Sequence, residues 1–456
     1  MKMTFSDLNF IFRLLPIFLI IYYLTPAKFR PWTLLAESLV FYYINEPILI
    51  VVLVAGTFVT WCFAKINIYR RWKWLLALGI ILDVSLLGFF KACGVLKLGI
   101  IIPIGLSYFV FKLISYQVDS FRGMISGTSF IDLANYLLMF PQIISGPIAR
   151  FNYIIENDFW RKEQDKFGAR FYKVISRIED GLKYFVIGLF FKVIIADHLA
   201  ILWNDIKTIG YESISTPLAW LGAYTYSLDL YFDFWGYSLM AAGVGIMLGF
   251  PFIRNFDQPY FASSISDFYR RWHSTLGTWF RDYVYFPLGG NRKGWLRTAF
   301  NLIVVWIFTG IWHGITLNFL IWAGVICLII MIEKFVLSHV KWLYMIIGRI
   351  NVLVIIPVTW VIFAIHSFKD LRLYLLRLFP IWDISIAVNG NDYIKCLKSY
   401  WPFLALGLFF TMPFVTNIYK KHKDNFLIVL GLFGLFWVAI FSLANSSGNP
   451  FMYLRF

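Results

Sequence analysis

The stretch TAFNLIVVWIFTGIWHGITLNFLIWAGVICLIIMIEKF, residues 298–335, decides the fold class of this chain. It contains two apolar runs, Phe300 to Trp312 and Leu317 to Phe335, with His313 between them. A helix that crosses a bilayer needs about 20 mostly apolar residues. A titratable ring in such surroundings is costly and usually has a function. The stretch therefore predicts neighbouring membrane helices around a functional histidine.

The composition extends this prediction to the whole chain. Of its 456 residues, 60% are hydrophobic and 14% are charged, whereas soluble domains are roughly 45–50% apolar and about 25% charged. Because the apolar stretches are continuous rather than alternating, a membrane β-barrel is excluded. We expect an all-α polytopic membrane protein of roughly 11–14 helices, including re-entrant segments. No repeat or long linker divides the chain, so residues 1–456 are predicted to form a single multi-pass domain. The apolar windows fall near 9–24, 32–44, 48–64, 74–90, 98–116, 130–148, 181–200, 217–235, 239–250, 298–312, 317–335, 343–366, 399–415 and 426–443.

The charge of the chain indicates its orientation rather than a nucleic-acid partner. Lys and Arg number 41 against 25 Asp and Glu, a net charge of +16, and the cytoplasmic loops of membrane proteins are rich in such cations. An N-terminus outside the cytoplasm puts the first two basic loops inside. The basic loop 161–177 is also inside if one of the windows 98–116 and 130–148 is re-entrant, and Pro141 and Gly146-Pro147 favour the second. The apolar run from Phe10 contains Arg13 and lacks a small-residue cleavage site, so it predicts a first membrane helix rather than a signal peptide.

Proline and glycine residues predict breaks in several helices. The clearest are Pro103-Ile-Gly105, the segment from Pro141 to Pro147, and Gly243-Val-Gly245. Because non-helical backbone at membrane depth survives only where protein or water covers it, these breaks predict a thick body that contains a cavity, although some could be ordinary kinks.

Familiar catalytic and metal-binding motifs are missing from the sequence. The four cysteines, at 62, 93, 327 and 396, form no CxxC pair, so neither a disulfide framework nor a metal site is predicted. The sequence also contains no GxSxG, HExxH or P-loop motif, which disfavours the common hydrolase and ATPase classes.

The stretch SISDFYRRWHSTLGTWFRDYVYFPLGGNRKGWLR, residues 264–297, is too polar to face lipid. It predicts a helix that ends at Pro287 and Gly289-Gly290, lying either at the membrane interface or inside the protein. Asp267 and Arg271 are spaced i,i+4 and can form an ion pair. His273 and Arg281 are eight residues apart, so they are expected on one helical face.

The remaining ionisable groups have plainer interpretations. Asp229 and Asp233 are also spaced i,i+4 in an apolar window, and pairing with a basic residue of a neighbouring helix is favoured over catalysis. His313 itself could be a buried ring bonded to a carbonyl, although Gly310 and Gly314 permit the close approach of a ligand or helix. The other histidines, at 198, 339, 366 and 422, fall at expected helix ends or in basic loops.

These motifs together resemble the membrane-bound O-acyltransferases, and in particular the bacterial alginate O-acetyltransferase branch. The most specific block runs from the Arg-Arg-Trp-His that ends at His273 to the Trp-His-Gly around His313. Supporting elements are FPQIISGPIAR at 140–150, YFDFWGYS at 231–238 and NPFMYLRF at 449–456. One departure is Leu239, where the branch usually has an acidic residue, and this puts in doubt any acceptor or partner contact that depends on that carboxylate.

The resemblance implies a fold, an activity and a location. The fold is a many-helix body with a central tunnel and His313 near its middle, in the cytoplasmic membrane of a bacterium. The activity is transfer of an acetyl group from cytoplasmic acetyl-CoA to a hydroxyl of an extracytoplasmic polysaccharide, often through a partner acetyltransferase of the SGNH type. No bound cofactor or metal is implied.

Histidine chemistry agrees with this activity, because a hydroxyl is a poor nucleophile until a base takes its proton, and histidine is the usual base near neutral pH. His313 is assigned as the general base and His273 as a second group that orients the thioester or the hydroxyl. Arginine side chains suit the phosphates of coenzyme A, although they could equally be ordinary loop cations. The substrate-binding candidates are Arg270, Arg271, Arg281, Asp282, Asn291, Arg292, Lys293 and Trp312.

Three alternatives remain open. A D-alanyl transferase of the same family would act on teichoic acid and take its acyl group from a carrier-protein thioester. A transporter would line its substrate path with the same polar residues, although inverted repeats are not visible. A structural scaffold of a polysaccharide export complex would need neither histidine.

Overall fold

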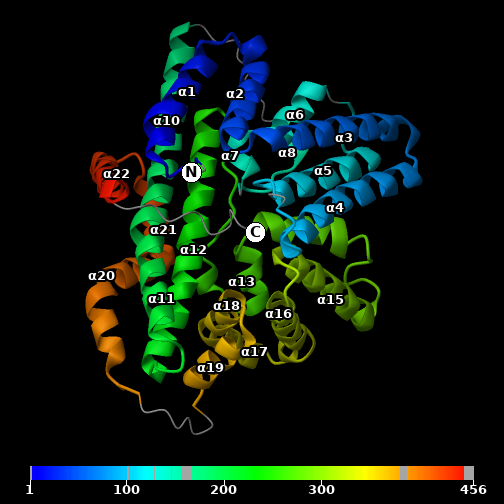
Figure 1. Cartoon of the computed structure of the whole chain (residues 1–456). Coiled ribbons are helices and arrows are strands. Elements are labelled where there is room, and N and C mark those ends of the chain that lie inside the picture. The colour runs from blue at the N-terminus through cyan, green and yellow to red at the C-terminus, as the bar shows by residue number, and fades with distance from the viewer. Residues whose placement is uncertain are drawn as a thin grey trace. The chain divides into compact units, whose positions relative to one another are not determined.

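The computed structural model describes residues 3–99, 102–127, 129–144, 146–155, 167–380 and 388–445. Helices joined by turns and loops make up these ranges, and no strand occurs in them (Figure 1). The expectation of an all-α fold is therefore confirmed for the described part of the chain. The C-terminal element 449–456 lies outside the described residues, as do Ser145 of the element 140–150 and part of the basic loop 161–177.

The chain forms two compact units, each described by itself. Unit 1 comprises Met1–Leu189, Tyr237–Arg254 and Leu443–Arg455, and unit 2 comprises Phe190–Gly236, Asn255–Ser442 and Phe456. The prediction that residues 1–456 act as one domain stays a prediction.

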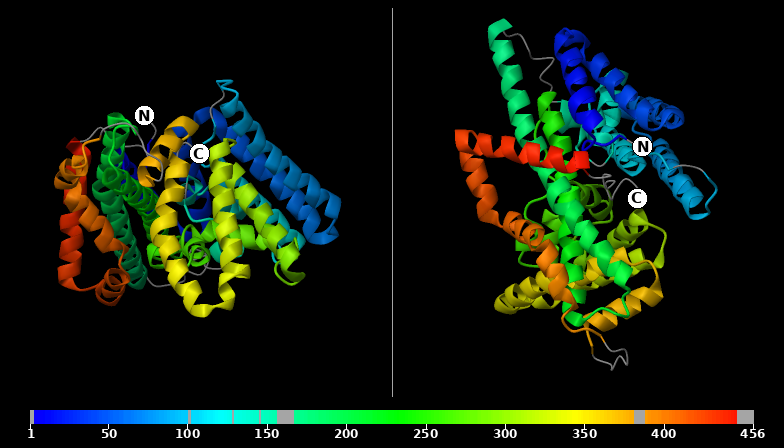
Figure 2. Two further views of the ribbon diagram at one scale, coloured as in Figure 1. Left: turned by 90° about the horizontal axis from the view of Figure 1, so that it is seen from below. Right: turned by 60° about the vertical axis from the view of Figure 1, so that its left-hand side comes forward.

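Unit 1 is built mainly from the N-terminal helices. Its helices are α1 (Leu15–Leu24), α2 (Arg30–Asn45), α3 (Ile50–Arg70), α4 (Lys73–Val95), α5 (Leu106–Phe121), α6 (Phe130–Leu138), α7 (Phe140–Ile143), α8 (Phe151–Ile155) and nearly all of α10 (Phe167–Phe190). Helix α5 packs against both α3 and α4 (Figures 1 and 2).

Two of the three predicted breaks are present, and both lie in unit 1. Helix α5 begins directly after Gly105, whose φ of 73° is left-handed and whose Cβ position would lie 1.8 Å from the backbone oxygen of Ile143. The described residues of the window 130–148 form only α6 and α7, which have 9 and 4 residues. At 1.5 Å per residue, neither helix can cross a bilayer. That the window is re-entrant stays a prediction.

The third predicted break, at Gly243-Val-Gly245, is wrong. Helix α12 (Thr216–Met247) runs for 32 residues without interruption through both glycines. A Cβ on Gly243 would lie 2.5 Å from the backbone oxygen of Gly181 in α10, and a Cβ on Gly181 would meet Gly243 at the same distance. The small residue therefore serves a close crossing of two helices rather than a break.

Unit 2 is built mainly from helices that follow Phe190. Its helices are α11 (Asp197–Ile209), the first part of α12, α13 (Ile265–Arg271), α14 (Ser274–Phe280), α15 (Gly294–His313), α16 (Leu317–Phe335), α17 (Lys341–Ile350), α18 (Ile356–Ala364), α19 (Phe368–Leu378), α20 (Asp392–Thr411), α21 (Pro413–His422) and α22 (Phe426–Asn445, except its last three residues). Helices α15 and α16 lie side by side, and α16 also packs against α13 and α18 (Figure 1).

A buried ion cluster joins α11 and α12 inside unit 2. Lys192, in the π-helical turn before α11, lies 2.6 Å from a carboxylate oxygen of Asp197 and 2.7 Å from one of Asp233. The prediction that Asp233 pairs with a basic residue of a neighbouring helix is confirmed. Asp229 is buried one turn earlier on α12.

The predicted long helix in residues 264–286 is wrong in one respect. Helix α13 ends at Arg271, and His273 has a φ of 45° before α14 begins. Since a left-handed residue interrupts the helix, His273 and Arg281 do not share a helical face. The predicted end is confirmed, because a π-helical turn at Arg281–Tyr285 leads to Gly289 and Gly290, with φ of 109° and 60°.

Seven helices among the described residues are long and apolar enough to cross a membrane, or eight if α20 and α21, which meet at 69°, count as one span. They are Ile50–Arg70, Lys73–Val95, Phe171–Ile209, Gly294–His313, Leu317–His339, Lys341–Ala364 and Phe426–Asn445. The two apolar runs on either side of His313 are among them.

Candidate functional site

His313 ends α15 among aromatic side chains. Its ring lies 4.4 Å from the ring of Trp312 and makes edge-to-face contacts with Trp322 of α16 at 5.1 Å and Phe363 of α18 at 5.0 Å, between ring centroids. Phe319 lies farther, at 6.1 Å. The imidazole thus sits in a largely apolar wall, and its residue is 9% exposed.

Two glycines allow α16 to pack closely against the end of α15, as the sequence predicted. A Cβ on Gly310 would lie 3.0 Å from the backbone oxygen of Phe319, and a Cβ on Gly314 would lie 2.5 Å from the ring of Phe319. Gly314 also follows the last residue of α15 and ends the helix. The small residues around His313 therefore bring α16 and its aromatic rings close to the imidazole.

His273 is held by hydrogen bonds rather than by rings alone. Its Nδ1 lies 2.9 Å from Oδ1 of Asn255, which also accepts a hydrogen bond from the hydroxyl of Thr275 at 2.8 Å. Phe234 of α12 packs edge-to-face against the imidazole at 4.7 Å. Burial lowers the pKa of His273 from 6.5 to about 3, so the ring is neutral at physiological pH.

Trp312 joins the two histidines. Its indole lies 6.3 Å from the ring of His273 and 4.4 Å from that of His313, between centroids. Residues that are far apart in the sequence therefore meet at one aromatic side chain, and the structure brings His273, Trp312 and His313 into a single cluster. This cluster, together with Asn255, is called the histidine site below.

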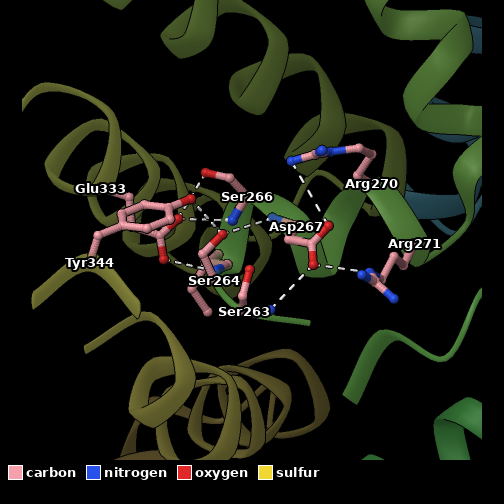
Figure 3. A network of polar contacts seen from close by, with 9 residues as sticks. Ser263, Ser264, Ser266, Asp267, Arg270, Arg271, Glu333 and Tyr344 are labelled. Carbon is pink, nitrogen blue, oxygen red and sulfur yellow. Dashed lines mark hydrogen bonds and ion pairs between the residues drawn. The ribbon is translucent and has the colours of Figure 1, made fainter. Parts of the chain in front are cut away.

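Helix α13, which leads into His273, is anchored at its first residues by a carboxylate from α16. Glu333 accepts hydrogen bonds from the backbone N–H of Ile265 at 2.7 Å, from that of Ser266 at 2.9 Å, and from the Ser266 hydroxyl at 2.8 Å (Figure 3). The Ser264 side chain accepts from the backbone N–H of Asp267, and Tyr344 of α17 donates to the Ser264 hydroxyl at 2.9 Å. Glu333 is 1% exposed, so this anchor lies inside the protein.

The two arginines before His273 turn toward Asp267. Nε of Arg271 donates to an oxygen of Asp267 at 3.0 Å, and a terminal nitrogen of Arg270 lies 3.9 Å from the other oxygen (Figure 3). The predicted i,i+4 ion pair is therefore confirmed. The Arg270 side chain is 73% exposed, which leaves it accessible to a charged ligand.

The other binding candidates lie beyond α14. Arg281 pairs with its neighbour Asp282 through two contacts of 2.8 and 3.3 Å. Asn291 and Arg292 are exposed in the turn before α15. Asn301 of α15 fastens this turn by donating to the backbone oxygen of Gly290 at 2.8 Å.

Helix α15 separates that turn from His313. Its 20 residues place the basic turn and the histidine at opposite ends of the helix, roughly 30 Å apart at 1.5 Å per residue. Asn291 and Arg292 therefore lie far from the histidine site, whereas Arg270 and Arg271 precede His273 by only two or three residues.

Comparisons with known proteins identify the family. A model of the membrane-bound O-acyltransferase family matches residues 53–369. The chain belongs to this family. It is 32% identical to a probable alginate O-acetylase of Pseudomonas putida over an alignment that covers 100% of both chains. It is also 32% identical to a peptidoglycan O-acetyltransferase of Helicobacter pylori, over 70% of this chain and 68% of that protein. A teichoic acid D-alanyltransferase of Bacillus subtilis is 30% identical over 48% of this chain and 56% of its own length.

Membership makes this protein an O-acyltransferase, and its candidate spans make it a multi-pass membrane protein. The resemblance inferred from the motifs is thus confirmed. The roles of individual residues stay predictions.

Sequence reasoning missed two polar residues of the site. Asn255 stands 18 residues before His273 in a segment without a recognisable motif, so only the fold reveals it. Glu333 could have been predicted to be a buried structural residue, because a carboxylate within an apolar helix usually has a partner inside the protein. The central tunnel that the resemblance implies stays a prediction.

Proposed function

We propose that this O-acyltransferase moves an acetyl group from cytoplasmic acetyl-CoA to a hydroxyl of an extracytoplasmic polysaccharide, in the cytoplasmic membrane of a bacterium. The observation that carries the proposal is the histidine site, where His273 and His313 contact the same indole in a member of this family. The O-acetylating relatives, which align with most or all of this chain, favour acetyl as the acyl group.

The reaction uses His313 as the general base. An acceptor hydroxyl gives its proton to the imidazole while its oxygen attacks the thioester carbonyl carbon. The carbon–sulfur bond then breaks, and the thiolate takes the proton from the imidazolium. The products are an O-acetyl ester and free coenzyme A, so no other reactant is needed. The aromatic wall of Trp312, Trp322 and Phe363 keeps bulk water from competing with the acceptor.

The donor is proposed to approach along the cationic residues. Arg270, which is exposed and near His273, can receive a phosphate of coenzyme A. Further candidates for contact with the donor are the cations Arg271, Arg281, Arg292 and Lys293, together with Asp282 and Asn291. Because α15 separates Asn291 and Arg292 from His313 by roughly 30 Å, these two can contact only the part of the donor farthest from its acetyl group.

Two features of the proposal have alternatives. The acetyl group reaches the acceptor either directly or through an SGNH-type acetyltransferase partner. We favour the partner because the O-acetylating branch often uses one. The second candidate function is D-alanyl transfer to teichoic acid from a carrier-protein thioester. The similarity to the Bacillus subtilis enzyme, which extends over about half of this chain, favours it.

The test is the transfer of radiolabelled acetyl from acetyl-CoA in membranes that express the wild type, together with its host's polysaccharide machinery. Label should reach extracytoplasmic glycan in the wild type and be lost in His313→Ala at equal protein level. Phe308→Ala, which removes an exposed side chain of the same helix, is the matched control and should retain transfer.

Two results would change the proposal. Equal labelling in the wild type and His313→Ala would exclude the general-base role and favour a scaffold. Absence of acetyl label in an active wild type, with label delivered from a D-alanyl carrier protein instead, would favour the teichoic acid reaction.

A further inference from the structure

Asn318 of α16 joins the loop that follows His313 to the end of α18. Its Nδ2 lies 3.1 Å from Nδ1 of His366 and 3.4 Å from each of the backbone oxygens of residues 362 and 363. Its Oδ1 accepts a hydrogen bond from the hydroxyl of Thr316 at 2.5 Å. Asn318 is buried, so its side chain fixes His366 beside the loop.

These contacts determine the tautomer of His366. Backbone oxygens can only accept hydrogen bonds, so the NH₂ group of Asn318 faces them, and the same group donates to Nδ1 of His366. Nδ1 therefore has the lone pair, and Nε2 carries the proton. His366 is exposed, and its Nε2 forms no hydrogen bond within the described part of the chain. The ring thus has one N–H donor available to a ligand.

His366 also lies close to His313. The ring of Phe319 is 6.1 Å from that of His313 and 5.5 Å from that of His366, so the two imidazole centroids are no more than 11.6 Å apart. Phe363, which packs against His313 at 5.0 Å, precedes His366 by three residues. A single molecule can therefore contact His366 while one of its hydroxyl groups lies beside the buried His313.

The surroundings of His366 differ in charge from the proposed donor path. Residues 310–320 and 362–368 contain no Lys or Arg. The cations Arg292 and Lys293, which are candidates for contact with the donor, precede the opposite end of α15. The phosphates of coenzyme A need such cations, so the surface around His366 suits an uncharged molecule rather than the donor.

We propose that His366 is an acceptor-binding residue, whose Nε2–H donates a hydrogen bond to an oxygen of the molecule that presents its hydroxyl to His313. The attacking hydroxyl gives its proton to His313 as before, and His366 contacts a different oxygen of the same molecule. This inference rests on the proposed O-acyl transfer and adds the residue that holds the second substrate.

The neighbours of His366 favour a protein as that molecule. Ile315 and Leu317 flank Thr316, Phe368 follows His366 by two residues, and these three apolar side chains are each about half exposed. A polysaccharide would leave many of its hydroxyl groups facing them, whereas a protein can combine one hydroxyl side chain with apolar neighbours. The first acceptor is therefore inferred to be a hydroxyl side chain of a partner protein, whose acetyl ester then exchanges with a polysaccharide hydroxyl without a further reactant.

Two substitutions separate the roles of the two ring nitrogens. In His366→Gln the side-chain NH₂ takes the place of Nε2 and can still donate to the acceptor. In His366→Asn the side-chain oxygen takes the place of Nδ1 and keeps the hydrogen bond with Asn318, but no outer donor remains. In membranes with the host's polysaccharide machinery, transfer from labelled acetyl-CoA should fall about three- to tenfold in His366→Asn, the usual effect of losing one hydrogen bond. It should stay near the wild-type rate in His366→Gln.

The KM for acetyl-CoA should not change in either variant, because the donor is held elsewhere. The midpoint of thermal unfolding should also stay the same. His339→Gln is the matched control, since His339 is an exposed histidine beyond the other end of α16, and it should transfer acetyl at the wild-type rate.

The opposite pattern, with transfer lost in His366→Gln and kept in His366→Asn, would show that His366 only fastens the loop through Asn318. Wild-type transfer in His366→Asn, or a raised KM for acetyl-CoA, would also overturn the inference. If only a D-alanyl carrier protein acts as donor, the acetyl proposal fails and the same variants are compared with that donor, because both reactions need a hydroxyl acceptor. A wild type that transfers no acyl group from either donor would overturn both proposals.

A short pulse of labelled acetyl-CoA tests the nature of the acceptor. In the wild type, label should appear first as a hydroxylamine-sensitive ester on a protein other than this chain, and later in glycan. Both signals should fall together in His366→Asn. Label that enters glycan without any labelled protein would mean that the polysaccharide itself binds at His366, and would overturn the choice of a protein.

Discussion

The two histidines of the site are held in different ways. His273 has a left-handed backbone with a φ of 45°, and its Nδ1 lies 2.9 Å from Oδ1 of Asn255. His313 ends a regular helix and is surrounded by the rings of Trp312, Trp322 and Phe363. Hydrogen bonds determine which nitrogen carries the proton, whereas aromatic packing fixes position and limits water. The comparison teaches that His273 suits a fixed orienting role and His313 suits a base that gains and loses a proton.

The largest effect is expected from removing each histidine. His313→Ala should lower acetyl transfer by about 10²–10⁴-fold, the usual contribution of general acid–base catalysis. His273→Ala should lower it less, by about 10–100-fold, because it removes an orienting hydrogen bond and leaves the base in place. The rates are measured with labelled acetyl-CoA in membranes at matched protein levels.

The double variant sharpens this comparison. If the two rings act on one hydroxyl, the double variant should be about as slow as His313→Ala alone, since groups that act as a unit are not additive. Effects that multiply would show that the histidines act independently, and a larger loss in His273→Ala than in His313→Ala would reverse their roles.

The second prediction concerns pH. In Asn255→Asp the carboxylate beside Nδ1 favours the imidazolium, so it should raise the pKa of His273 from about 3 toward the ordinary value near 6.5. If transfer requires neutral His273, the loss of transfer on acidification should begin at higher pH in Asn255→Asp than in the wild type. The groups that pack against the ring, Phe234, Trp312 and Asn255, carry no charge in the wild type.

The measurement is the rate of transfer between about pH 5 and 8, in the wild type, Asn255→Asp and Thr275→Val. Thr275→Val should follow the wild-type curve. An acid limb that stays in place in Asn255→Asp would mean that protonation of His273 does not control the reaction.

Part of the fold and site follows from sequence because its causes are local. The apolar runs on either side of His313 predict α15 and α16, and Asp267 with Arg271 predicts an ion pair, since spacing alone determines both. Pro103 and Gly105 correctly place the start of α5. The prediction of a break at Gly243 was wrong. A glycine that breaks a helix and one that permits a close helix crossing look the same in sequence, and only the contact with Gly181 distinguishes them.

The remainder depends on residues that are distant in sequence. The break at His273 is imposed by Asn255, and the start of α13 is fixed by Glu333, 68 residues after Ile265. The apolar sequence around His313 marked it as functional, and the resemblance to a family assigned roles to both histidines. Their different surroundings depend on which helices pack together. Tertiary contacts thus override the local helical preference of residues 264–286.

The third prediction concerns the Glu333 anchor. Glu333→Gln replaces one of the two carboxylate oxygens with an NH₂ group. This group cannot accept a hydrogen bond from a backbone N–H at the start of α13. A buried unsatisfied donor costs about 1–3 kcal/mol, so the midpoint of thermal unfolding should fall. Transfer should fall several-fold, because α13 leads into His273. Glu212→Gln, at an exposed carboxylate, is the control and should change neither. Unchanged stability and transfer in Glu333→Gln would show that the anchor does not position His273.

The smallest effect is expected at Asp267, the other carboxylate on α13. Asp267→Asn keeps an oxygen that can accept from the Ser263 N–H but removes the charge that attracts Arg271 and Arg270. Ion pairs with exposed partners contribute about 0.2–1 kcal/mol, so stability should barely change. Freed from Asp267, both arginines become more available to phosphate, and the KM for acetyl-CoA should stay the same or fall. A KM that rises several-fold in Asp267→Asn would mean that the carboxylate holds an arginine in the geometry that binds the donor. The ion pair would then belong to the donor site, and Glu333 alone would be the structural anchor of α13.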